Sequence, residues 1–126
     1  MGKINSDVML MAHLMRRAGF GATKLELEKY TTQGYEETID MLLQSNEANE
    51  INDALVRRYF PDQSTTHDSN GAGSYWLYRL ITTDTPLKEK MALFWHNIFA
   101  TGYAKVTNGK PLTDQMRMFR DHGLGH

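Results

Sequence analysis

The 126-residue sequence contains no cysteine, three prolines and no long uninterrupted apolar run. The absence of cysteine excludes a disulfide scaffold and any metal site built on thiolates. The longest apolar run falls well short of the roughly 20 residues that a membrane helix requires. The amino terminus carries Asp7, His13 and two arginines where a secretory signal would continue apolar, so we expect no signal peptide and no membrane span in this chain. These features do not determine the cellular compartment of the protein.

The sequence also lacks a large excess of either charge. Its formal net charge is -1 and its pI is about 6.5, whereas a nucleic-acid-binding protein usually carries a basic patch. We therefore expect no nucleic-acid partner. The charges are uneven, because residues 24–53 hold eight acidic and two basic residues while residues 86–120 hold six basic and two acidic ones. The simplest interpretation is two solvated surfaces of opposite sign.

Apolar residues follow a helical period through most of the chain, and no segment has the sustained alternation of a strand. We predict an all-α fold, an irregular array of about six or seven helices. The expected helices cover residues 6–18, 23–31, 35–44, 49–60, 75–83 and 86–102 and the end of the chain. Their expected amino-terminal caps are polar residues that accept a hydrogen bond from the first turn: Ser6, Thr23 with Glu26, Asn49, Thr85 and Thr113.

The expected helix over residues 86–102 should be central. Pro86 suits a first helical position, and no formally charged residue follows Lys90 before Lys105. One face should carry Leu87, Met91, Phe94, Trp95 and Ile98, with His96 on the other side beside Glu89. The preceding helix should bury Trp76, Leu77, Leu80 and Ile81.

Near the amino terminus, the first helix should bury Val8, Met11, Ala12, Met15 and Ala18 and end at a left-handed Gly19. The helix over residues 35–44 should bury Tyr35, Ile39, Leu42 and Leu43. Residues 61–74 are rich in turn formers and predict a mobile surface loop, in which His67 and Asp68 are a weak signal for metal. At the other end, the last helix should carry Met116, Phe119 and Leu124.

Four blocks of the sequence together resemble a known family. They are HLMRRAGFGAT (13–23), GYEETIDMLL (34–43), LKEKMALFWHNIFAT (87–101) and QMRMFRDHGLG (115–125). In this order they resemble the start of the bacterial family called domain of unknown function 1800. Members of that family are substantially longer, which implies that residues 1–126 are a single amino-terminal helical segment of a larger domain, truncated at His126.

The resemblance implies a largely helical fold, frequent export of the family and neighbouring genes of another family, domain of unknown function 1501, whose protein is a possible partner. The resemblance supplies no established reaction, and the cofactor stays unknown. The family block commonly has a second histidine two positions after His96, where this chain has Ile98. A role that needs both histidines is therefore weakened here.

Three histidines recur in these blocks and are the candidates for metal binding: His13, His96 and His122. The usual local spacings of a metal site are absent. The simpler interpretation of His96 is a hydrogen-bonded histidine between packed helices. Arg16 and Arg17 can clamp an anion, but we favour pairing with the acidic stretch from Glu36 to Asp53.

Two hypotheses of function follow from the sequence. The first is a structural or interaction role, without activity of its own, within a larger and exported or envelope-associated protein, whose remainder beyond His126 is the main partner. The alternative is part of a metal-dependent or hydrolase-like enzyme that uses His96, His13 and Arg17 as catalytic residues together with residues beyond His126. Convergence of His13, His96 and Glu89 on one cavity would favour the enzyme.

Overall fold

The computed structural model describes residues 2–44, 58, 69–99, 101–102 and 109–125. Within these residues the fold is all-α and contains no strand, as the sequence predicts. The helices are α1 (Gly2–Ala18), α2 (Lys24–Gln33), α3 (Tyr35–Leu43), α5 (Ser69–Thr82), α6 (Pro86–Ile98) and α7 (Lys110–His122). None of them is both long and apolar enough to cross a membrane.

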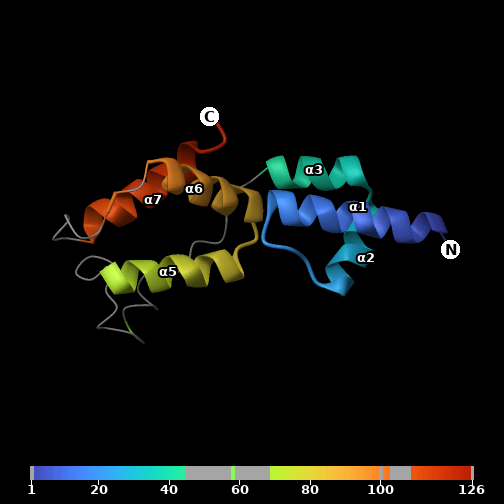
Figure 1. Cartoon of the computed structure of the whole chain (residues 1–126), viewed down its shortest axis with the longest axis horizontal. Coiled ribbons are helices and arrows are strands. Elements are labelled where there is room, and N and C mark those ends of the chain that lie inside the picture. Colours follow the sequence, from blue (N-terminus) through green and yellow to red (C-terminus); the bar gives the residue numbers. More distant parts are fainter. Residues whose placement is uncertain (1, 45–57, 59–68, 100, 103–108, 126) are drawn as a thin grey trace.

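The helices form two groups that meet at α6. Figure 1 shows α1, α2 and α3 at one end of the molecule and α5, α6 and α7 at the other. Helix α6 contacts α1 and α3 in the first group and α7 in the second. It is therefore central to the arrangement, as predicted, although it ends at Ile98 rather than near residue 102.

Helix α1 is longer than expected and ends differently. It begins at Gly2, so Ser6 lies inside the helix and is not its cap. Met11 and Met15 are buried, as predicted from the apolar stripe. Gly19 does not have a positive φ; its special requirement is space, because a Cβ there would lie 3.0 Å from the Pro86 Cβ at the start of α6. The positive φ of 103° occurs at Gly21 instead.

The residues just before α2 and α3 determine where these two helices begin. Thr23 and Glu26 form the predicted capping box: the Thr23 side chain accepts from the Glu26 N–H, and the Glu26 carboxylate accepts from the Thr23 N–H at 2.7 Å. Gly34, with φ 109°, makes the turn between the two helices, a conformation that favours glycine. In α3, Leu42 is buried as expected, but Leu43 is exposed and Thr38 takes the fully buried place. Its hydroxyl donates to the Gly34 carbonyl at 2.7 Å.

Helix α5 corrects two predictions. It begins at Ser69, so residues 69–74 of the predicted loop are helical instead. His67, Asp68 and the expected helix over residues 49–60, apart from Arg58, which is helical, lie outside the described residues. Leu77 and Ile81, predicted to be buried, are 59% and 75% exposed. Among the described side chains of this helix, residues 73–82, the buried one is instead Arg79. The apolar period correctly predicted a helix, but it did not show that the face with Arg79 would be buried and the face with Leu77 and Ile81 exposed.

Helices α6 and α7 pack against each other through aromatic rings. Pro86 begins α6 as predicted, although the Thr85 side chain makes no capping hydrogen bond. Helix α7 begins at Lys110, so Thr113 lies inside it and is not its cap. The predicted α6 face is only half right, because Phe94 and Ile98 are exposed. Stacked pairs run from Trp95 to Phe99 and from Phe99 to the buried Phe119.

Candidate functional site

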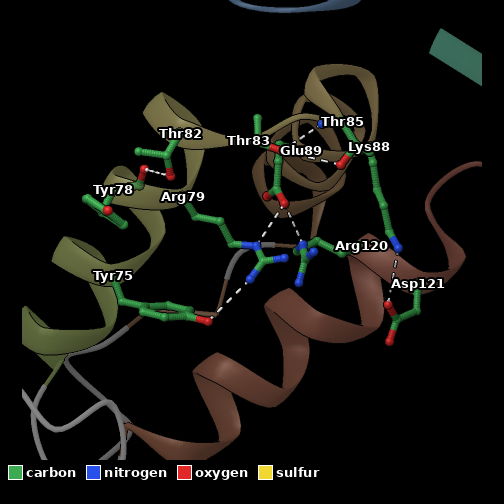
Figure 2. A network of polar contacts seen from close by, with 10 residues as sticks. All are labelled: Tyr75, Tyr78, Arg79, Thr82, Thr83, Thr85, Lys88, Glu89, Arg120 and Asp121. Atoms are coloured by element: carbon green, nitrogen blue, oxygen red, sulfur yellow. Dashed lines mark hydrogen bonds and ion pairs between the residues drawn. The ribbon is translucent and has the colours of Figure 1, made fainter. Parts of the chain in front are cut away.

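The most deeply buried polar group on α6 is the carboxylate of Glu89, whose relative exposure is 0%. It lies in the first turn of the helix that Pro86 begins. Its Oε1 atom accepts hydrogen bonds from Arg79 Nε at 3.0 Å and from Arg120 Nε at 2.7 Å (Figure 2). One oxygen therefore joins three helices, because Arg79 lies on α5 and Arg120 on α7. We call Arg79, Glu89 and Arg120 the charge cluster.

Arg79 is held from two sides. It donates through Nε to Glu89 and through Nη1 to the Tyr75 hydroxyl at 3.3 Å, one turn earlier on α5. Its side chain is 5% exposed. Burial acts to lower the pKa of Arg79, but the hydrogen bond and the attraction of Glu89 outweigh it and the pKa is raised. Arg79 therefore remains a cation in this buried place.

Arg120 comes from the last turn of α7 and keeps 9% of its side chain exposed. The next residue, Asp121, faces Lys88 of α6 at 3.8 Å. That second ion pair is neutral and partly solvated, so it adds little stability and no net charge to the cluster. Figure 2 shows that both contacts join α6 to α7.

The charge cluster contains two cations and one anion in a place almost closed to water. The second carboxylate oxygen, Glu89 Oε2, is buried and has no hydrogen-bond partner among the described residues. Removing charges from water is expensive, and the cost is returned only where the charges are well paired. Both arginines of the charge cluster are paired with Glu89, but one carboxylate neutralises only one of the two positive charges.

A second group of buried polar atoms lies two turns along α6. His96 follows Glu89 by seven residues, which places it on the same helix face about 10 Å away along the axis. The Trp76 ring from α5 meets the His96 ring edge-on, with centroids 5.0 Å apart. Trp76 Nε1 and His96 Nδ1 are both buried without a hydrogen-bond partner among the described residues. His96 therefore packs against Trp76 of α5, and no hydrogen bond of its ring is seen among the described residues. Its structural or catalytic role stays a prediction.

The other candidates from the sequence lie apart from these groups. His13, Arg16 and Arg17 are exposed on α1, and His122 is exposed at the end of α7. No hydrogen bond or ion pair among the described residues joins His13, Arg17 and His96, and the predicted pairing of Arg16 and Arg17 with acidic side chains is not present there either. Within the same residues no group of three or more histidine or carboxylate side chains is placed to hold a metal. Catalytic and metal roles for these residues stay predictions.

A hollow of about 860 Å³ opens between the α1–α2 junction and the end of α5. Besides apolar side chains, the lining includes Thr23 and Glu26 of the capping box and Tyr30. Burial, followed by the negative charges of Glu26 and Asp84, raises the pKa of Tyr30, so its hydroxyl stays protonated at neutral pH. The lining residues include Met15, Phe20, Tyr30, Leu77, Ile81 and Pro86.

Comparison with known proteins decides the family. The chain matches the family described as "Protein of unknown function (DUF1800)" over residues 13–126. It belongs to the DUF1800 family. The resemblance seen in the sequence blocks is thereby confirmed. Searches of curated proteins and of solved structures gave no match for this DUF1800 protein.

The family's description assigns no function, and it therefore gives no role to the charge cluster. Sequence reasoning named Glu89 only as a neighbour of His96 that could converge with His13 on one cavity, and it did not single out Arg79 or Arg120. One signal was present: Arg79 interrupts the apolar run WLYRLI of α5, and Arg120 follows the apolar Phe119 in α7. Charged residues at inward helical positions need a buried partner, and here Arg79 and Arg120 both pair with Glu89.

Proposed function

We propose that this DUF1800 segment has a structural and interaction role, in which its helices form one side of a larger helical assembly within its own domain. The observation that carries this proposal is the imbalance between its buried and exposed apolar side chains. The buried apolar residues of the described chain are few: Met11, Met15, Leu42, Ala92 and Phe119. Large apolar side chains are exposed on every helix whose side chains are described.

Two exposed apolar surfaces are well defined. On α5, Leu77 and Ile81 are four residues apart and therefore share one face of the helix. At the end of α6, Phe94, Ile98 and Phe99 are each at least half exposed. Contiguous exposed apolar residues of this kind mark surfaces that pack against other protein. The charge cluster supports the same role, because it fixes three helices relative to one another and so presents these surfaces in a constant arrangement.

The role is tested by removing apolar surface without changing charge. The double variant Leu77→Gln/Ile81→Gln keeps good helix formers on α5. We expect the unaltered chain to bind the dye ANS and to self-associate in light scattering at micromolar concentration, and the double variant to do both clearly less. The control Thr32→Gln/Ser74→Gln alters two exposed polar positions and should behave like the unaltered chain. A monomeric chain that binds no dye would refute the proposal.

A further inference from the structure

Helix α1 carries an exposed face that is apolar near the middle of the helix and basic at its end. Met9 and Leu10 are 67% and 49% exposed. Arg16 and Arg17 follow them by seven residues each and are exposed as well. Because seven residues make about two turns, the arginines lie on the same side as the apolar pair, about 10 Å further along the axis. No ion pair among the described residues involves either arginine. We call these four residues the basic face.

Helix α3 carries a face of the opposite charge. Glu36, Glu37 and Asp40 are exposed, and the helix contains no basic residue. Met41 and Leu43 are 40% and 55% exposed. Leu43 follows Glu36 by seven residues, so these two side chains lie on one side of the helix, again about 10 Å apart. No ion pair among the described residues involves the three carboxylates. We call these five residues the acidic face.

The two faces match each other only when the helices run in opposite directions. Along α1 the apolar pair comes first and the arginines follow, whereas along α3 the carboxylates come first and the apolar residues follow. An antiparallel alignment places Arg16 opposite Glu36 and, seven residues away on both helices, Met9 opposite Leu43. A parallel alignment would place the arginines against the apolar residues of α3. Charge and apolar contact therefore select the same antiparallel register.

A single molecule does not make this match. Helices α1 and α3 both contact α2 and α6, and Figure 1 shows α1 and α3 running in the same direction. This direction agrees with the absence of ion pairs between the two faces among the described residues. A two-fold axis perpendicular to the helices would reverse the direction of the partner's α3 relative to α1, which is the orientation that the match requires.

We propose that the partner of these faces is a second copy of this chain, with the basic face of each copy packed antiparallel on the acidic face of the other in a two-fold dimer. The inference goes beyond the proposed structural role, which concerns the surfaces on α5 and α6. Two-fold symmetry makes the contact twice, so every charged face meets its complement. Opposite charges set the register and the exposed apolar side chains supply the burial. Few side chains take part, so the dimer is weak.

The first test is sedimentation equilibrium of the full 126-residue chain and of Leu77→Gln/Ile81→Gln, which lacks the apolar surface of α5. In about 50 mM sodium chloride we expect both to dimerise with a dissociation constant of roughly 10–100 µM. In about 500 mM sodium chloride the dimer should be roughly ten-fold weaker, because salt screens exposed charge pairs. A monomeric Leu77→Gln/Ile81→Gln in low salt would assign the association to α5 and overturn this inference. An association that salt does not weaken would overturn it as well.

The second test reverses the charge of one face at a time. Arg16→Glu/Arg17→Glu makes both faces acidic. In Glu36→Lys/Glu37→Lys two lysines oppose the arginines of the other copy. Each variant alone should dimerise at least ten-fold more weakly, whereas an equal mixture should recover the dimer because each contact again joins opposite charges. With one variant labelled with ¹⁵N, the amide resonances of α1 and α3 should shift on mixing.

A matched control separates this recovery from a general effect of charge. Lys24→Glu/Arg117→Glu alters the net charge by the same amount as the α1 variant, at exposed positions on α2 and α7, and should dimerise like the unaltered chain. Equal weakening by both variants would overturn the inference. So would a mixture of the two folded reversed variants, checked by circular dichroism, that stays monomeric. If one of them does not fold, the salt dependence of Leu77→Gln/Ile81→Gln decides.

Discussion

Arg79 and Arg120 donate to the same oxygen of Glu89, although the first lies on α5 and the second on α7. Among the described residues no backbone hydrogen bond links these two helices. Side chains alone therefore set how they lie relative to one another. Where the apolar core is as small as it is here, a buried ionic contact shared by three helices has an unusually large share in defining the fold.

Removing the shared carboxylate should strongly destabilise the protein. In Glu89→Gln two buried guanidinium groups lose their counter-charge, and we expect a loss of about 3–5 kcal/mol in the free energy of unfolding. Urea denaturation followed by circular dichroism measures the change. The control is Glu28→Gln, since the Glu28 carboxylate is 60% exposed and lies 3.8 Å from Lys24, which is worth at most about 0.5 kcal/mol. Equal effects of the two substitutions would contradict a central role for the charge cluster.

Gly123 should not tolerate a side chain. A Cβ at this position would overlap the Phe119 carbonyl oxygen and lie 3.1 Å from Trp95 Cδ1. Trp95 also donates its Nε1 hydrogen to the Gly123 carbonyl at 2.8 Å. Gly123→Ala should therefore separate the end of α7 from α6, lower the free energy of unfolding by about 1–3 kcal/mol and change the Trp95 fluorescence.

The matched control for that substitution is Gly73→Ala on α5. Nothing lies within 4 Å of the Cβ that would be added at Gly73. Alanine is a better helix former than glycine, so this variant should gain up to about 1 kcal/mol. The prediction fails if both alanine variants shift the urea midpoint in the same direction.

The capping box of α2 should make that helix sensitive to acid. Hydrogen bonds from the Thr23 backbone and side chain hold the pKa of Glu26 below its usual value of 4.5. A carboxylate whose pKa is depressed in the folded state stabilises that state above pH 4.5, and this contribution is lost as the pH falls through the folded pKa. The pKa of Glu26, measured by NMR titration of its side-chain carbon, should rise toward 4.5 in Thr23→Ala. It should not move in Thr32→Ala, whose hydroxyl bonds only the Glu28 carbonyl.

The positions of the helices were largely predictable from the sequence, because apolar period and capping chemistry are local. The box at Thr23 and Glu26 and the first position of Pro86 are examples, since each depends on residues within one turn. The direction in which a helix faces was less predictable. Leu77 and Ile81 have the right spacing for a core face, yet α5 turns Arg79 inward because Glu89 offers it a counter-charge.

The charge cluster itself was not predicted, and the reason is physical. Its members are distant in sequence, and a charged residue in an amphipathic helix ordinarily faces water. Only the packing of α5, α6 and α7 shows that three such residues meet. His13 and His96 were prominent because histidine is chemically versatile, but chemical versatility does not determine where a side chain lies. In the structure one is exposed on α1 and the other packs against Trp76.

Lys90 should connect the two groups of helices. Its Nζ donates to the Arg16 carbonyl at 2.7 Å and to the Gly19 carbonyl at 2.6 Å, where α1 ends. These carbonyls have no partner within their own helix, and a cation there also interacts favourably with the helix dipole. Lys90→Met keeps the apolar part of the side chain and removes the donor, so we expect a loss of about 1–2 kcal/mol. Amide hydrogen exchange should quicken in the last turn of α1 more than in α7.

Lys88→Met on the same helix separates this effect from a general loss of charge. Among the described residues the only ion-pair partner of Lys88 is the half-exposed Asp121 at 3.8 Å. Its removal should therefore cost no more than about 0.5 kcal/mol and leave exchange in α1 unchanged. Because α1 and α6 meet through few other groups, the two lysine variants differ mainly in whether the end of α1 stays attached. Slow exchange at the end of α1 in Lys90→Met would mean that the close approach of Gly19 to Pro86 holds the two helices together without the lysine.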